Sequence, residues 1–83
     1  MKRKHALLLI GEMCKEHREN IGMKQSQVAE SVGYSEQNIS SFETGRTNNL
    51  LIFLYYISIG VLESRTNYHM IKYILEGLRN EDN

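Results

Sequence analysis

Three glycines, Gly22, Gly33 and Gly45, divide the middle of this chain into two short segments of nearly equal length. Glycine is common just past the end of a helix, because it adopts the left-handed backbone conformation without steric cost. Between these glycines, apolar residues recur at a spacing that lets them face one shared core: Val28, Ala29, Val32, Ile39 and Phe42. The pattern therefore predicts two short helices, about 25–32 and 36–44, with Ser35 as the N-cap of the second.

Three further helices are expected around this pair. The first runs from about Lys4 to Asn20, and one buried stripe is predicted along it: Ile10, Cys14, His17 and Ile21. The next begins after Asn48 or Asn49 and extends to Ile59, before Gly60. The last covers about 67–78, with a narrow apolar stripe: Ile71, Ile74, Leu75 and Leu78. The expected fold class is all-α, a compact five-helix domain.

Composition excludes several classes of protein. Hydrophobic residues make up 41% of the 83 residues and proline is absent, which favours a folded helical domain over disorder. The single cysteine, Cys14, rules out an internal disulfide and suits the reducing cytoplasm, where we expect the protein. The longest apolar run, 50–57, is too short to span a bilayer, and no secretory signal is convincing. We therefore expect no membrane association.

The predicted helix 50–59 is apolar on almost every side. A helix in a domain this small cannot bury all of its faces against its own chain. Part of its surface is therefore expected to contact a partner, and we predict a homodimer in which the last helix supplies further apolar surface.

The second short helix is expected to present a polar face to solvent. Four residues near its start are polar and point away from the predicted core: Glu36, Gln37, Ser40 and Ser41. A polar helix face held out by a compact core fits the major groove of DNA. There Gln37 can pair with adenine through N6 and N7, and Glu36 can accept a hydrogen bond from cytosine N4.

Residues 18–46 resemble the Cro-like helix-turn-helix family of phage repressors, also called Xre-like regulators. The matching residues lie at fixed offsets across two helices and both turns: Arg18, Gly22, Gln25, Val28-Ala29, Val32-Gly33-Tyr34-Ser35, Ile39-Ser40, Glu43 and Gly45. The resemblance extends over about 6–61 and implies a phage-repressor-like DNA-binding core there, with the helix-turn-helix at about 25–44. It leaves 62–83 as a C-terminal helix, a possible dimerisation element. Small proteins of this family are frequent in phages and mobile elements.

The resemblance also implies roles for individual residues. Gln25 resembles the glutamine that binds a phosphate and braces the recognition helix. Lys24 replaces the usual Ser or Thr cap, at a cost of roughly 1 kcal/mol, and is expected to contact a phosphate instead. Bases are read by Glu36, Gln37 and Ser40, with Ser41 beside them. The backbone is contacted by Arg46, Thr47 and Asn48. Arg18 and Glu43 match a family ion pair that joins the first helix to the end of the recognition helix.

These observations predict a sequence-specific transcriptional regulator, expected to be a repressor, that binds double-stranded DNA. The alternative is a protein-interaction module of the same fold that is an antagonist or adaptor of another regulator and binds no DNA. The zero net charge and Glu36 favour that alternative. Either could have a regulatory protein partner. Paired carboxylates and a phosphate-binding glycine loop are absent from the sequence, so neither an enzyme nor a cofactor is expected.

Three other features have both a structural and a functional interpretation. Cys14 and His17 have a spacing that could bind a metal, but no second ligand pair lies near them in the sequence, so no metal site is expected. The basic segment 2–5 is either an arm that reaches DNA or a solvated helix start. The remaining group is aromatic and is expected in the core or at an interface: Phe53, Tyr55, Tyr56, Tyr68 and Tyr73.

Overall fold

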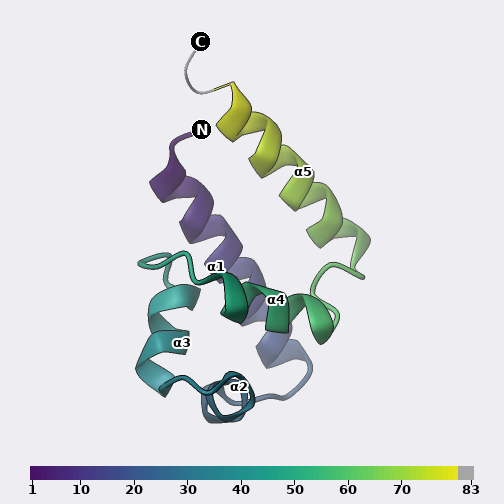
Figure 1. The fold of residues 1–83 in the computed structure, drawn as a ribbon. Coiled ribbons are helices and arrows are strands. Elements are labelled where there is room, and N and C mark those ends of the chain that lie inside the picture. Colours follow the sequence, from purple (N-terminus) through teal and green to yellow (C-terminus); the bar gives the residue numbers. More distant parts are fainter. Residues whose placement is uncertain (81–83) are drawn as a thin grey trace.

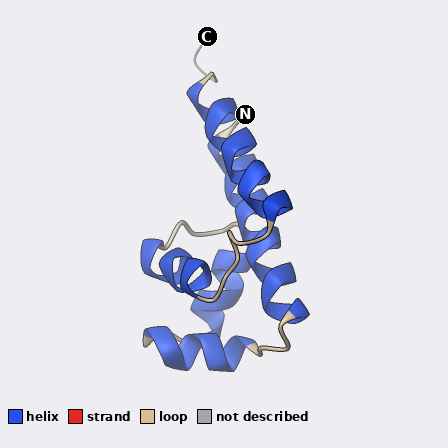
Figure 2. Ribbon diagram, turned by 90° about the vertical axis from the view of Figure 1, so that its right-hand side faces the viewer, coloured by secondary structure: helices blue, strands red, loops and turns tan. Residues whose placement is uncertain are grey.

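The computed structural model describes residues 1–80, which form five helices and no strand. In chain order they are α1 (Arg3–Asn20), α2 (Gln25–Val32), α3 (Glu36–Glu43), α4 (Leu50–Ser58) and α5 (Arg65–Arg79). Helices α2, α3 and α4 surround the C-terminal half of α1 (Figure 1). The N-terminal half of α1 and α5 run side by side in opposite directions and project from this core (Figure 2). The predicted all-α class is confirmed.

The helix ends follow local signals in the sequence. Gly33 and Gly45 have φ values of +77° and +78°, in the left-handed region expected after α2 and α3. The side chains of Ser35 and Asn49 accept hydrogen bonds from backbone N–H groups in the first turns of α3 and α4, at 3.2 and 3.1 Å. Ser64 caps α5 in the same way, and this cap explains why α5 begins two residues earlier than we predicted.

The core of the domain is built from α1 to α4 and the turn after α4. Its buried members are Met13, Cys14, Val28, Ala29, Ile39, Phe42, Ile52, Tyr56 and Val61. Val32 packs against them and is half-buried. The apolar residues predicted to face one core from the two short helices therefore do so.

The stripe predicted along α1 is only partly correct. Cys14 is buried and Ile10 packs against the core, but Ile21 is 46% exposed. The helix ends at Asn20, so Ile21 lies in the turn and no longer follows the helical period. The buried side of α1 consists instead of Ala6, Gly11, Met13, Cys14 and Arg18.

The stripe predicted along α5 is also only partly correct. Ile74 is buried and Ile71 and Leu78 are half-buried, but Leu75 is 60% exposed. The reason is that α5 packs mainly against α1, so much of its circumference stays uncovered. Within residues 1–80, no helix combines the length and apolar character needed to cross a membrane.

Candidate nucleic-acid interface

The start of α3 carries polar side chains on its solvent side. Glu36 and Gln37 are exposed, and within residues 1–80 their side chains make no hydrogen bond or ion pair. Ser40 and Ser41, one turn later, are half-buried. The opposite side of the helix is fixed by Ile39 and Phe42, which are buried. The helix therefore holds an amide and a carboxylate outward on a rigid support.

The start of α2 combines an exposed lysine with a half-buried glutamine. We expected that the Lys24 side chain would not cap the helix, and it does not. Instead, Gln27 Oε1 accepts a hydrogen bond from the backbone N–H of Lys24 at 2.8 Å, which satisfies that donor at the start of α2. Gln25 Nε2 donates to Glu43 Oε1 at 3.0 Å. An amide nitrogen carries two hydrogens, so the second N–H of Gln25 can donate to another acceptor.

The loop between α3 and α4 exposes three polar residues, Arg46, Thr47 and Asn48. Gly45 places this loop directly against α1, because a Cβ at position 45 would lie 2.7 Å from Leu8 Cα. Arg46 N donates to the carbonyl oxygen of Ser41 at 2.9 Å, which ties the loop to the end of α3. The loop is therefore held against both helices while its side chains face solvent.

A buried carboxylate joins the four helices of the core. Arg18 donates to Glu43 through Nε at 2.7 Å and through Nη2 at 3.0 Å, so the expected ion pair is present in bidentate form. Tyr56 from α4 also donates to Glu43, through its hydroxyl. With Gln25, each core helix contributes one member to this group: Arg18, Gln25, Glu43 and Tyr56 are the Glu43 network.

Electrostatics keep the Glu43 network ionised at its centre. Burial by itself would raise the pKa of Glu43, but hydrogen bonds from Arg18, Tyr56 and Gln25 hold the pKa below its ordinary value. Burial and the bond to Glu43 raise the pKa of Tyr56, so its hydroxyl stays protonated as a donor. A buried charge with several donors is the arrangement that lets a carboxylate remain in a protein interior.

Tyr56 is the member of this network that sequence reasoning did not identify. We expected it in the core or at an interface, and it is fully buried, stacked on Phe42 with ring centroids 5.9 Å apart. Its bond to Glu43 was not anticipated. The available signal was a tyrosine in a mostly apolar helix, expected in a core that was also expected to hold an ion pair.

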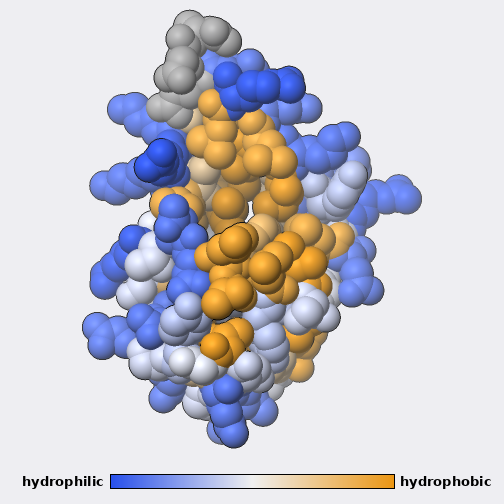
Figure 3. All heavy atoms as spheres, in the orientation of Figure 1, coloured by the Kyte–Doolittle hydropathy of each residue, from blue (hydrophilic) through white to orange (hydrophobic). Residues whose placement is uncertain are grey.

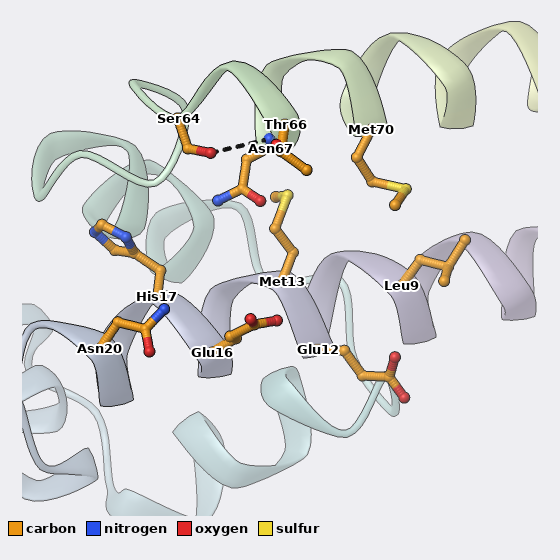
Figure 4. Close-up of a pocket in the computed structure, with 10 residues that line it drawn as sticks. All are labelled: Leu9, Glu12, Met13, Glu16, His17, Asn20, Ser64, Thr66, Asn67 and Met70. Carbon is orange, nitrogen blue, oxygen red and sulfur yellow. Dashed lines mark hydrogen bonds between the residues drawn. The ribbon is translucent and has the colours of Figure 1, made fainter.

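The structure separates Cys14 from His17. Cys14 is buried in the core, where burial raises the pKa of its thiol to about 12. His17 Nε2 lies 2.8 Å from the carbonyl oxygen of Ile59 and points toward the turn after α4 (Figure 4). No group of three or more His, Cys, Asp or Glu residues able to hold a metal occurs in the part of the chain that the structure describes.

A cleft of about 440 Å³ separates α1 from the first half of α5 (Figure 4). Met13, Met70 and Leu9 supply its apolar lining, and Glu12 and Glu16 are its charged members. Both glutamates are exposed. Two exposed carboxylates give this cleft a negative charge, which disfavours binding of an anion there.

Residues 15–49 match the family model described as helix-turn-helix. The matched segment contains the last third of α1, from Lys15, all of α2 and α3, and the loop up to the cap of α4. Comparison with curated proteins and with solved structures found no match.

Proposed function

We propose that this protein is a DNA-binding transcription regulator that reads a specific DNA sequence with α3, since residues 15–49 match the helix-turn-helix family model. The observation that supports this proposal best is the pair of exposed, unpartnered side chains at the start of α3, Glu36 and Gln37. These two side chains can contact bases without first breaking hydrogen bonds within the protein, and breaking such bonds would reduce the affinity for DNA.

In the proposed complex, α3 enters the major groove. Base edges are contacted by Glu36, Gln37, Ser40 and Ser41. Helix α2 lies across the backbone, where Lys24 and the second N–H of Gln25 reach phosphates. On the other side of α3, phosphates are bound by Arg46, Thr47 and Asn48. Glu43 positions Gln25 from behind, at 3.0 Å.

We further propose a homodimer on DNA. Leu50, Leu51 and Leu54 on α4 are 65%, 57% and 48% exposed, although α4 is the most apolar helix of the protein. Figure 3 shows apolar surface over α4 that continues between α1 and α5. Contiguous apolar surface on a small domain is typical of a protein interface. Two copies would then read half-sites about one helical turn apart.

Repression is the proposed direction of regulation. A dimer bound at a promoter can block it with its DNA-contacting surface and its dimer surface alone. In this proposal 6–61 contains the reader, and the helix within 62–83 adds to the dimer surface. Residues 81–83 of that segment lie outside the described residues.

The experiment that tests sequence reading is selection of bound sites from random duplexes, followed by Gln37→Ala. The variant should lose about 1–3 kcal/mol at the selected site and relax one base position. Asn20→Ala is the matched control, since it removes an exposed amide from the end of α1. Equal weakening of all sequences by Gln37→Ala would show that Gln37 reads no base.

The dimer is tested separately by sedimentation. Leu54→Glu places a charge in the exposed stripe of α4 and should give a monomer that is folded and binds a half-site weakly. An unchanged sedimentation coefficient at the same protein concentration would remove α4 from the interface.

The rival function is a protein-interaction module that does not bind DNA. The zero net charge of the chain and the exposed carboxylate of Glu36 favour it. A DNA-binding protein that neutralises phosphates shows a linear fall of log affinity with log salt concentration. A slope near zero, or no retention on duplex DNA at low salt, would favour the protein-interaction module over the DNA-binding regulator.

A further inference from the structure

A basic groove lies between the first turns of α1 and the loop after α3. One wall is formed by residues 2–5 with Leu7 and Leu8, and the other by residues 44–46. The walls are in direct contact, because Gly45 lies against the backbone of Leu8. Two segments about forty positions apart in sequence therefore form one surface.

The groove concentrates positive charge that the protein itself does not neutralise. Lys2, Arg3, Lys4 and Arg46 are exposed, and none of them forms an ion pair within the described part of the chain. The first turn of α1 contains no acidic residue. Cations at a helix N-terminus are unfavourable, since that end already carries a partial positive charge. A bound anion would relieve this repulsion.

The location of the groove indicates which anion it accepts. Arg46 lines the groove and also belongs to the loop that is proposed to contact the DNA backbone. The basic surface therefore continues directly from the proposed interface. The only aromatic ring in the groove lining is the imidazole of His5, and the bases of a duplex are already stacked on one another, so contacts there would be to phosphates and not to bases.

We propose that Lys2, Arg3 and Lys4, together with Arg46, bind the phosphate backbone of duplex DNA outside the base pairs that α3 reads. This inference rests on the proposed DNA-binding function and extends it. The segment is a helix start, with Lys2 as N-cap and Arg3 as the first residue of α1, and not an extended arm. The contact adds affinity without adding sequence preference, because phosphates are the same at every base pair.

The test compares the wild-type protein with a triple variant, Lys2→Ala, Arg3→Ala and Lys4→Ala. Each lost phosphate contact should reduce the slope of log affinity against log salt by about 0.9, so the triple variant should lose about 2 to 3 units of slope. Its order of preference among selected sites should be unchanged.

The matched control removes three exposed cations from α5, by Arg65→Ala, Lys72→Ala and Arg79→Ala. It makes the same change in net charge, so it measures the effect of overall charge alone. We expect its slope to change by less than one unit. Thermal unfolding of the first triple variant should be no lower than that of the wild type, because the substitutions relieve repulsion at the start of α1.

A second measurement locates the contact on the DNA. Wild-type affinity should rise when a duplex that ends at the selected site is extended by about one helical turn on each side, whereas the affinity of the first triple variant should not. The inference would be overturned if the two triple variants had equal slopes of log affinity against log salt, or if flanking DNA had no effect on the wild type. Neither result would affect the proposal that Gln37 reads a base. Absence of any DNA binding by the wild type would overturn the proposed function itself.

Discussion

Tyr56→Phe removes one hydroxyl from the Glu43 network and leaves the aromatic ring in place. Tyr56 is fully buried and its ring stacks on Phe42, so the substitution creates almost no cavity. What is lost is a hydrogen bond to an ionised acceptor, Glu43. Such bonds contribute about 1.5–3 kcal/mol. Glu43 keeps its bonds to Arg18 and Gln25, so no buried charge is left without partners, and we expect a loss of about 2 kcal/mol.

The assay is urea and thermal unfolding at pH 7, with Tyr55→Phe as the control. Tyr55 is half-buried on the same helix, and its hydroxyl has no hydrogen-bond partner among residues 1–80. In a domain of this size, 1 kcal/mol corresponds to roughly 4–8 °C in Tm, so Tyr56→Phe should lower Tm by roughly 8–16 °C. Tyr55→Phe should change the free energy of unfolding by less than about 0.5 kcal/mol.

The effect of Tyr56→Phe should also depend on pH. The folded protein lowers the pKa of Glu43, so the stability that this carboxylate contributes is present above its unfolded pKa and is lost as pH falls through the folded pKa. The difference between wild type and variant should therefore shrink in acid. Equal losses in Tyr56→Phe and Tyr55→Phe at pH 7 would refute the view that the Tyr56 hydroxyl stabilises the network.

Gly11→Ala should destabilise the protein by about 3 kcal/mol in urea, because its Cβ would lie 2.5 Å from the backbone oxygen of Glu43 and force α1 and α3 apart. Gly77→Ala, whose Cβ would lie 2.9 Å from the Cβ of Met1, should cost less, because the first residue of the chain can shift more easily than two packed helices; similar losses in both would contradict the steric argument. Arg18→Ala should cost about 3–5 kcal/mol because Glu43 loses its buried cation, with little change in DNA sequence preference; a parental Tm would show that the pair is not structural. Burial raises the pKa of Cys14 from 9.0 to about 12, so the unfolded state loses this proton first and stability should fall as pH rises from about 9; a stability profile that stays level there would count against it.

Most of the helix ends could be predicted from the sequence because each depends on residues close to it. Gly33 and Gly45 adopt the left-handed backbone conformation, and Ser35 and Asn49 cap the helices that follow them. The Arg18–Glu43 pair was also expected, although from a family resemblance and not from spacing. Periodicity was less reliable at helix ends and on a helix that packs mainly against one other helix, as Ile21 and Leu75 show.

The chain by itself determined that five helices form, where most of them end, and that the start of α3 is polar. These properties depend on interactions between residues close together in the chain, so they can be recognised from the sequence alone. Only the tertiary structure decided that Tyr56 donates to Glu43, and that Lys2, Arg3 and Lys4 share a groove with Arg46. Such contacts join segments far apart in sequence, and they are fixed by how whole helices pack and not by any local pattern.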